Sequence, residues 1–234
     1  MVNEIIIRER TPFWLMVYGV YLYFCCTSFR RASRALEPWI ERSYVAIWGW
    51  VQKLGFLADR FAFGRDAVES FLVDETQIKV GAQEAWLWLA FEPRSRKILG
   101  FYLSRARNML VAYNFLKELR RKYGKKTLYT DGGAWYIQAA KWARLEHLIY
   151  DEYTKNVVER FIETLKDRLE CFDDYFPCMK EDCECEHVRN WISVYALIYN
   201  YVRDHMALGR PPVRDLERMM EVQRFQELFR RCLS

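Results

Sequence analysis

Three carboxylates in this chain have the residue types and surroundings expected of a metal-dependent phosphoryl-transfer site. Asp74 lies in the middle of an apolar, β-rich run, FLVDETQIKV, where a charge is rarely placed unless it is paired or binds a metal. Asp131 ends a second such run, KTLYTD, and two glycines follow it, at the carboxyl end of a strand where α/β sheets commonly build their sites. Glu159 belongs to NVVERFIETLKDRL and lies at the edge of the apolar arc that a helix would give this segment.

These three acids would repel one another if they converged without a counter-charge. A pair of divalent cations removes that repulsion, and oxygen ligands favour Mg²⁺ or Mn²⁺. Two such ions can stabilise both the attacking and the leaving oxygen of a phosphoryl transfer. Each acid also has a plainer interpretation, because Asp74 could pair with a lysine, Asp131 could cap a turn and Glu159 could be a surface residue.

The segments around these acids predict an α/β domain with a ribonuclease-H-like order of elements. Antiparallel strands are expected at 71–80, 85–91 and 97–104, further strands at 126–130 and 147–150, and helices at 108–123, at 134–143 and around Glu159. Three strands followed by helix, strand, helix, strand and helix is the order of a sheet covered by helices. The predicted domains are a helical segment at 1–62, a ribonuclease-H-like catalytic domain at 63–210 and a C-terminal helix at 211–234. That last helix could mediate association or pack on its own domain.

Basic residues are concentrated in one part of the chain, although the formal net charge of the 234 residues is only +5. Residues 94–126 contain 11 Lys and Arg against 1 acidic residue, a net charge of +10. Such a block predicts a surface that binds a polyanion, with Lys125 and Lys126 among the candidates for DNA contact. A solvated helix face has the same pattern and is the alternative.

The N-terminal segment predicts a pair of helices with arginines around the turn between them. The first runs over residues 28–36 and ends before Pro38, and the second begins at Ser43 as its N-cap and ends at Gly55. The arginines around the turn are Arg30, Arg31, Arg34 and Arg42. This arrangement is typical of a DNA-binding helix-turn-helix, and an ordinary packing hairpin of helices is the alternative.

Two features bear on the compartment. The apolar run at 13–26 carries no charge but has only 14 residues, short of the roughly 20 that cross a bilayer. We therefore expect a buried helix or strand there rather than membrane association. The chain has 7 cysteines, an odd number that includes the adjacent pair Cys25-Cys26, and this does not match a secreted disulfide framework. A cytoplasmic protein without a membrane partner is predicted.

A cluster of metal-ligand residue types follows the expected Glu159 helix. Its members are Cys178, Cys183, Cys185 and His187. Zinc sites usually space their cysteine pairs by about two to four residues, a pattern that this run fits poorly. Zn²⁺ binding, a Cys178–Cys183 disulfide and free thiols are the three interpretations that the cluster allows.

Three of these segments together resemble the DDE-type transposases of insertion sequences. VDETQIKV followed by Trp86, then LYTDGGAWY, then NVVERFIETLKDRL are similar to this family of the retroviral-integrase-like superfamily, most closely to archaeal relatives of the group named after insertion sequence six. The basic helix pair resembles that group's helix-turn-helix, and LIYNYVRDHMALGRPP resembles the tail after the catalytic helix. The resemblance covers about residues 25–205. One departure is the 27 residues between Asp131 and Glu159, fewer than is common in integrase relatives.

This resemblance implies both a metal site and a reaction. It assigns Asp74, Asp131 and Glu159 to the binding of two Mg²⁺ or Mn²⁺ ions, and it places Lys166 near DNA phosphate. The implied enzyme is a polynucleotidyl transferase that cleaves DNA at transposon ends and joins the freed 3′-hydroxyl to target DNA. Its partners would be terminal inverted repeats, target DNA and further copies of the chain in a dimer or larger assembly, at the prokaryotic nucleoid. A relative that binds DNA but has lost catalysis is the alternative.

Overall fold

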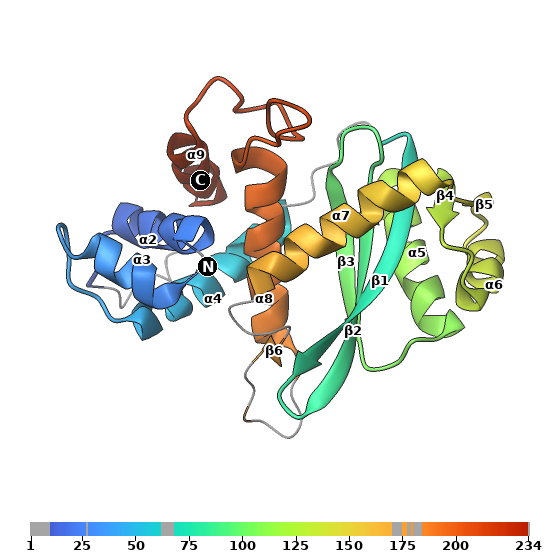
Figure 1. The fold of residues 1–234 in the computed structure, drawn as a ribbon, viewed down its shortest axis with the longest axis horizontal. Helices are drawn as coiled ribbons and strands as arrows, with labels where there is room; N and C mark the ends of the chain where they lie inside the picture. Colours follow the sequence, from blue (N-terminus) through green and yellow to red (C-terminus); the bar gives the residue numbers. More distant parts are fainter. Residues whose placement is uncertain are drawn as a thin grey trace. The chain divides into compact units, whose positions relative to one another are not determined.

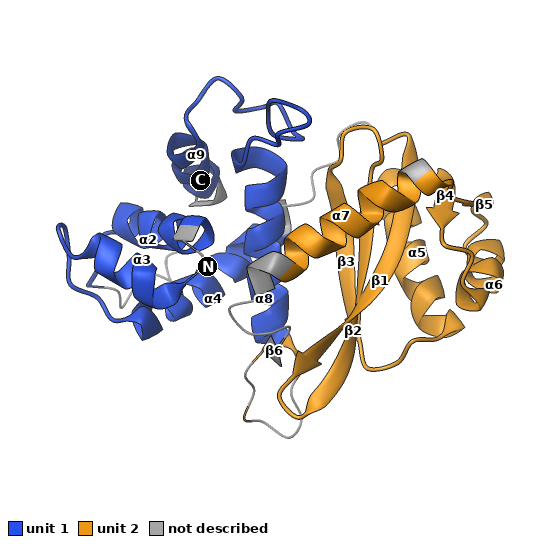
Figure 2. Cartoon of the chain, in the orientation of Figure 1, with its two compact units in different colours: residues 1–62, 186–234 blue, residues 63–185 orange. Residues whose placement is uncertain are grey.

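The computed structural model describes residues 10–26, 28–61, 68–169, 175–176, 179 and 184–233. The chain divides into two compact units, one formed by 1–62 and 186–234 and the other by 63–185 (Figure 2). The division after residue 62 coincides with the expected start of the catalytic domain. Residues 186–210, which we expected in that domain, group instead with the N-terminal helices, because α8 (Glu186–Leu197) packs along α4 (Tyr44–Phe61).

The second unit is built on one mixed β-sheet. Its strands are β1 (Ser70–Val80), β2 (Gln83–Phe91), β3 (Ile98–Ser104), β4 (Thr127–Thr130), β5 (His147–Ile149) and β6 (Tyr175–Phe176). β1, β2 and β3 are antiparallel neighbours, and β4 and β5 continue the sheet parallel to β1, in the order β3-β2-β1-β4-β5 (Figure 1). β6 pairs with the carboxyl end of β1. This topology confirms the predicted ribonuclease-H-like α/β fold.

Helices α5 (Met109–Tyr123) and α6 (Ala134–Trp142) cover one face of this sheet and complete the core. The odd-numbered residues in the first half of β1, such as Val73, point to that face and are buried, whereas Gln77 and Lys79 farther along the strand are exposed. The Asn108 side chain caps α5 by accepting a hydrogen bond from the backbone amide three residues on, at 3.0 Å. Gly124, with φ of +82°, ends the same helix as predicted.

Helix α7 (Glu152–Leu169) covers the other face. Val158, Phe161 and Leu165 of its predicted apolar arc are buried. The centroid of the Phe161 ring lies 4.0 Å from that of Phe91 on β2. Because Phe91 pairs across the sheet with Leu72, the even-numbered residues of β1, Asp74 among them, point toward the α7 side.

The first unit is helical. Its other elements are α2 (Phe13–Cys26), α3 (Phe29–Leu36), the π-helix η2 (Ile198–Val202) and α9 (Glu221–Leu233). The apolar run at 13–26 is therefore a helix, and side chains such as Met16 and Val20 are buried. α9 packs on this same unit, where Phe225 and Phe229 are fully buried. In the part of the chain that the structure describes, no helix is long and apolar enough to cross a membrane.

Helix α4 corrects one expectation from the sequence. Ser43 caps it as predicted, since its hydroxyl accepts a hydrogen bond from the Ala46 amide at 3.3 Å. Gly55 does not end the helix, which continues to Phe61. A Cβ atom at Gly55 would lie 2.4 Å from the carbonyl oxygen of Asn190 on α8, so glycine is required here for the close approach of two helices.

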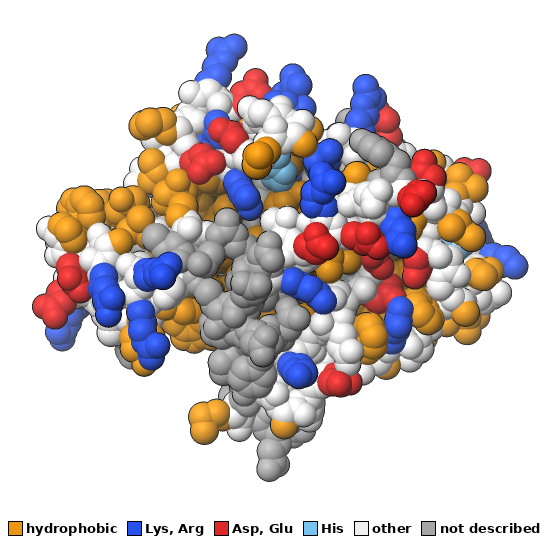
Figure 3. All heavy atoms as spheres, viewed as in Figure 1, with side chains coloured by type: hydrophobic (Ala, Val, Ile, Leu, Met, Phe, Trp, Pro, Cys, Tyr) orange, Lys and Arg blue, Asp and Glu red, His pale blue; other side chains and the backbone are white. Residues whose placement is uncertain are grey.

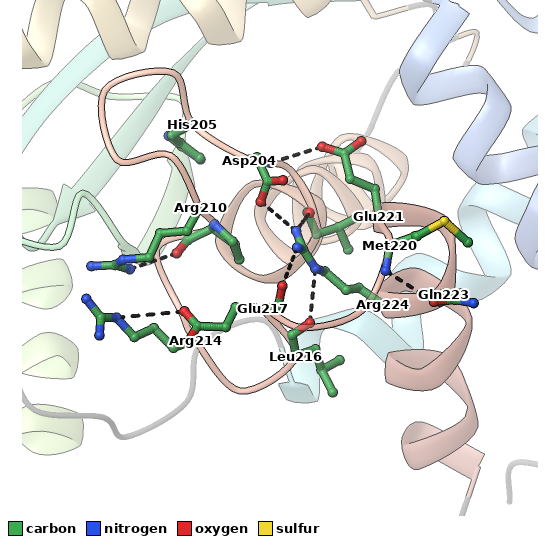
Figure 4. A network of polar contacts seen from close by, with 12 residues as sticks. Asp204, His205, Arg210, Arg214, Leu216, Glu217, Met220, Glu221, Gln223 and Arg224 are labelled. Carbon is green, nitrogen blue, oxygen red and sulfur yellow. Dashed lines mark hydrogen bonds and ion pairs between the residues drawn. The ribbon is translucent and has the colours of Figure 1, made fainter.

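The C-terminal helix begins later than predicted. We expected a helix from residue 211, but residues 203–220 form turns and α9 starts at Glu221. The guanidinium group of Arg224, buried in the first turn of α9, holds this preceding segment in place (Figure 4). It donates hydrogen bonds to the carbonyl oxygens of Val202, Leu216 and Glu217 at 2.7–3.0 Å and to the Asp204 carboxylate at 2.6 Å. The Arg224 side chain thus anchors as turns a segment for which the apolar pattern had predicted a helix.

Candidate active site

Asp74 and Asp131 come from neighbouring parallel strands. β1 and β4 are paired with Leu72 opposite Tyr129. Asp74 follows Leu72 by two residues and lies within β1. Asp131 follows Tyr129 by two residues and comes directly after the end of β4. The pairing therefore brings the two acids to the same edge of the sheet, at the carboxyl end of β4. Acidic side chains gather on this unit over α7 and the adjoining sheet, with Lys and Arg side chains between them (Figure 3).

The Asp74 carboxyl group is mostly buried, and its surroundings favour the protonated form. Its pKa is raised from the usual 3.8 to about 7, chiefly by burial and further by the negative charges of Glu75 and Asp131. The Glu75 amide, which donates a hydrogen bond to Asp74 Oδ1 at 2.9 Å, and the Arg107 guanidinium oppose this shift only in part. A buried acid beside like charges is the electrostatic condition that a bound cation relieves.

Asp131 is held by the turn that follows β4. Its Oδ1 accepts a hydrogen bond from the Gly133 amide at 2.8 Å, and the Gly132 amide donates to Thr130 Oγ1 at 3.1 Å. Gly132 has φ of +85°, a conformation that favours glycine over residues with a Cβ atom. The turn leaves Asp131 exposed at the edge of the sheet, where it is accessible to a ligand.

Glu159 lies on α7 beside the buried arc, and its side chain is 54% exposed. Its carboxylate is 3.6 Å from Lys155 Nζ, one turn earlier in the helix. Burial raises the pKa of the nearby Tyr150 hydroxyl, and the negative charges of all three acids raise it further. Among the described residues, no group of three or more His, Cys, Asp and Glu side chains is close enough together to hold a metal ion. The structure thus brings Asp74 and Asp131 together and places Glu159 near them, without completing a three-ligand site.

The chemistry of these donors fits a hard divalent cation. All three candidates offer carboxylate oxygens, which Mg²⁺ and Mn²⁺ prefer as ligands. The burial of Asp74 beside other negative charges adds an electrostatic demand for a cation at this edge of the sheet.

Comparison with known families decides what kind of domain this is. Residues 68–205, a range that includes all three acids, match the model of the DDE domain of IS240-type transposases. The chain belongs to this DDE domain family. The resemblance in the sequence motifs is therefore confirmed at the level of the family.

The chain is also similar to a protein of an archaeon and to solved structures of integrase catalytic core domains. An uncharacterized protein of Methanocaldococcus jannaschii is 26% identical over 197 residues, covering 84% of this chain and 90% of that protein. The catalytic core domain of BIV integrase gives a TM-score of 0.43 at 15% identity, covering 72% of this chain and 100% of its own. The HTLV-2 integrase catalytic core domain in complex with magnesium gives a TM-score of 0.46 at 15% identity, covering 62% of this chain and 92% of its own.

The DDE domain contains an acidic residue that the sequence did not single out. Glu75 is adjacent to Asp74 in β1 and therefore points to the opposite face, into the core. It pairs there with Arg107, a member of the basic block. The sequence did contain a signal for Glu75. Two neighbouring acids in one strand point to opposite faces, and the acid on the buried face needs a partner.

Three arginines of the basic block at 94–126 have partners within the DDE domain. Arg107 pairs with Glu75, Arg120 donates to the Ala143 carbonyl oxygen at 2.8 Å, and Arg121 pairs with Glu118 at 2.6 Å. Arg107 precedes α5, whereas Arg120 and Arg121 both lie in the last turn of that helix, where Arg121 is exposed. These three are among the 11 Lys and Arg residues at 94–126, and the binding of a polyanion by this block stays a prediction.

The three lysines predicted to contact DNA lie away from the aspartates. Lys125 and Lys126 precede β4, so they are at the end of that strand opposite to Asp131. Lys166 is partly exposed on α7, about 10 Å along the helix axis from Glu159. Their contact with DNA stays a prediction, and Lys166 is the one on an element that carries a candidate ligand.

The arginines predicted for the helix-turn-helix differ in their surroundings. Arg30, Arg31 and Arg34 are exposed on α3. Arg42 is half-buried, and its Nε donates a hydrogen bond to Thr11 Oγ1 at 2.8 Å. Arg42 therefore braces the turn before α4, whereas the three arginines of α3 are accessible to a partner.

The cysteine cluster falls largely beyond what the structure describes. Cys178 and Cys183 lie outside the described residues. Cys185 is buried and has φ of +57°. His187, in the first turn of α8, is half-buried with its ring 6.3 Å from that of Trp48. Zn²⁺ binding by this cluster stays a prediction.

In the metal-free protein, we expect Asp74→Asn to stabilise the DDE domain. Because folding raises the pKa of Asp74, its ionised form opposes folding, and this cost grows as the pH rises through the interval between the unfolded and folded pKa values. In EDTA at pH 8, the variant should gain about 2 kcal/mol of unfolding free energy in urea, and the gain should vanish toward pH 4. Glu84→Gln, at an exposed position of β2, is the control. A loss of stability in Asp74→Asn at pH 8 would contradict this electrostatic picture.

Proposed function

We propose that this chain is a transposase that cleaves DNA at the ends of a mobile element and joins those ends to target DNA, with Mg²⁺ or Mn²⁺ as cofactor. The observation that supports this most directly is the placement of Asp74 and Asp131 on adjacent parallel strands, near Glu159 on α7, within a matched DDE domain. Members of this family are polynucleotidyl transferases, and the donor set suits the ions that such chemistry uses.

The residues of the site would act by binding and positioning. Asp74, Asp131 and Glu159 would hold two divalent ions, which when bound stabilise the attacking and leaving oxygens of a phosphodiester displacement. Hydrogen bonds from the Glu75 and Gly133 amides fix the orientation of the two aspartates. Glu159 would leave Lys155 to join them.

The proposed reaction consists of two displacements at phosphorus. Water attacks a phosphodiester at the end of the element, which breaks the bond from phosphorus to O3′ and frees a 3′-hydroxyl. That hydroxyl then attacks a target phosphodiester in line. One P–O bond forms as another breaks, so no covalent enzyme–DNA intermediate is required.

The exposed arginines of α3 support a DNA-binding role for residues 1–62. Replacing Arg30, Arg31 and Arg34 together by alanine should weaken binding to end DNA about tenfold and lower the slope of log K against log salt by about 2–3, because each phosphate contact contributes about 0.9. Fluorescence anisotropy across a salt series measures both quantities. Arg121→Ala, at an exposed position of α5, is the matched control. An unchanged salt slope in the triple variant would exclude α3 from the DNA contact.

The active assembly is proposed to be a dimer or larger, working on DNA in the cytoplasm. Two ends of one element must be joined to one target, and each joining event needs a site. Pairing of two copies of the chain provides the second site.

A cleavage assay tests the proposed function. Inverted repeats in the chromosomal DNA that flanks the gene supply candidate ends, and labelled duplexes carrying them are incubated with the protein in Mg²⁺ or in EDTA. We expect products with a new 3′-hydroxyl in Mg²⁺ and none in EDTA. Binding without cleavage would favour the alternative, a DNA-binding relative that has lost catalysis. Absence of both binding and cleavage would contradict the proposal.

A further inference from the structure

An ion pair between the buried Glu75 and the partly exposed Arg107 lies directly behind Asp74, on the opposite face of β1. The side chain of Glu75 is 0% exposed, and its Oε1 accepts hydrogen bonds from Arg107 Nε at 2.8 Å and Nη2 at 2.5 Å. The Tyr136 hydroxyl, itself fully buried, donates to Oε2 of the same carboxylate. Both oxygens of Glu75 are thereby engaged, which makes this acid a structural anchor rather than a further metal ligand.

These contacts connect three parts of the DDE domain that are distant in sequence. Glu75 is in β1, Arg107 precedes α5, and Tyr136 lies in α6, the helix that begins just after the Asp131 turn. The strand that carries Asp74 is thus tied to the helix that follows Asp131. A carboxylate accepting bonds from a guanidinium and a phenol fixes both partners in direction as well as distance.

The Arg107 guanidinium is also held between two indole rings. It lies 3.9 Å from the centroid of Trp135 and 4.6 Å from that of Trp86. Such stacking of a planar cation on aromatic faces is favourable, most of all on tryptophan. Within the described residues, the buried Nε1 of Trp135 has no hydrogen-bond partner, so this ring is held by packing, on Arg107 and against the core of the domain.

Trp135 in turn packs against the turn that holds Asp131. A Cβ atom at Gly133 would lie 2.8 Å from the Trp135 indole and 3.2 Å from Asp131 Oδ1, so the ring packs directly against this glycine. The Gly133 amide is the group that donates to Asp131 Oδ1. An unbroken chain of contacts therefore runs from Glu75 through Arg107, Trp135 and Gly133 to the second aspartate.

We propose that Glu75 and Arg107 form a positioning pair that holds Asp74 and the Asp131 turn in place before metal ions bind. This inference rests on the proposed function. Two neighbouring carboxylates repel each other until a cation arrives, so their metal-free arrangement needs support from elsewhere in the fold. The pair supplies that support from the face of β1 opposite to Asp74. Partners of this kind commonly tune metal affinity.

The test measures metal binding directly, without DNA. Mn²⁺ is titrated into the full chain, and the EPR signal of free Mn²⁺ gives the affinity. Arg107→Met, which keeps the length of the side chain but removes the ion pair, should bind Mn²⁺ about tenfold more weakly than the wild type. The Arg107→Met variant should need about tenfold more Mg²⁺ to cleave DNA at half its maximal rate. At saturating Mg²⁺ its cleavage rate should recover toward that of the wild type. Arg121→Met, which breaks the exposed pair with Glu118, is the control and should match the wild type in both assays.

A second variant keeps the test decisive if Arg107→Met does not fold. Tyr136→Phe removes only the hydroxyl that donates to Glu75, and it should weaken Mn²⁺ binding about threefold. Wild-type Mn²⁺ affinity in a folded Arg107→Met, or in Tyr136→Phe if Arg107→Met is unfolded, would overturn the positioning role while leaving the proposed function intact. A wild-type protein that binds no Mn²⁺ would instead contradict the proposed function itself.

Discussion

Glu159→Gln is expected to slow DNA cleavage by at least about a thousandfold, equivalent to about 4 kcal/mol of barrier, with little change in folding stability. The amide keeps the size of the side chain but removes the charge that would bind an ion. In the metal-free structure Glu159 resembles an ordinary surface residue, half-exposed and 3.6 Å from Lys155. Loss of such an exposed helix pair costs only about 0.5 kcal/mol. If Glu159 is only a surface residue, Glu159→Gln should leave DNA cleavage nearly unchanged, whereas a metal ligand at this position predicts the large loss of rate.

Glu163→Gln is the matched control for this prediction. Glu163 is exposed one turn later on α7 and belongs to the same sequence segment. Single-turnover cleavage and urea unfolding should show wild-type behaviour for this variant, and the cleavage defect should be confined to Glu159→Gln. Equal cleavage rates in the two variants would remove Glu159 from the proposed site and leave the third metal ligand to be found elsewhere.

Arg224→Met is expected to lower the unfolding free energy of the first unit by about 3–5 kcal/mol. The Arg224 side chain is 6% exposed and is surrounded by acceptors that would lose their donor. Its partners are three carbonyl oxygens and the Asp204 carboxylate (Figure 4). Methionine fills the space but offers no N–H group, so buried acceptors would be left unpaired.

Arg231→Met provides the comparison, because Arg231 is also in α9 and pairs with Asp215 but has 44% of its side chain exposed. Urea unfolding followed by tryptophan fluorescence should show a loss of no more than about 1 kcal/mol for this variant. A similar small loss for Arg224→Met would mean that the turns before α9 do not depend on the buried guanidinium. The position of α9 would then need another explanation.

Local sequence signals predicted much of the fold. Ser43 begins a helix and Gly124 ends one, as expected from their capping chemistry. The antiparallel pairing of the first three strands followed from the succession of apolar runs, because consecutive strands pair most simply as an antiparallel meander. These features depend on residues that are neighbours in the chain.

The errors arose where a residue serves a distant partner. Gly55 matched the pattern of a helix end, but it is glycine because the Asn190 backbone of α8 lies against it. The expected helix before Glu221 has a suitable apolar pattern, but a buried Arg224 holds those residues as turns. Neither contact can be derived from residues within one turn or one strand.

In the candidate site, too, local signals were visible in the sequence and contacts between distant residues were not. Asp74 and Asp131 were predicted because an acid in or after an apolar strand is visible locally. The role of Glu75 depends on Arg107 and on Tyr136, which is 61 residues away in sequence. Net charge does not reveal which cations of the basic block have partners within the fold, as Arg107 has in Glu75, and DNA binding by this block stays a prediction.

The most direct test of the central claim is a strand-transfer assay that compares the wild type with Asp131→Asn. Both proteins are incubated with the same end DNA and a supercoiled target in Mg²⁺, and the joined products are counted by sequencing. The asparagine can still accept the hydrogen bond that the Gly133 amide donates to Asp131, so the turn should be kept while the charge is lost. We predict joined ends with the wild type and none with Asp131→Asn, at equal DNA binding. Joining at the same rate by both proteins would contradict the account.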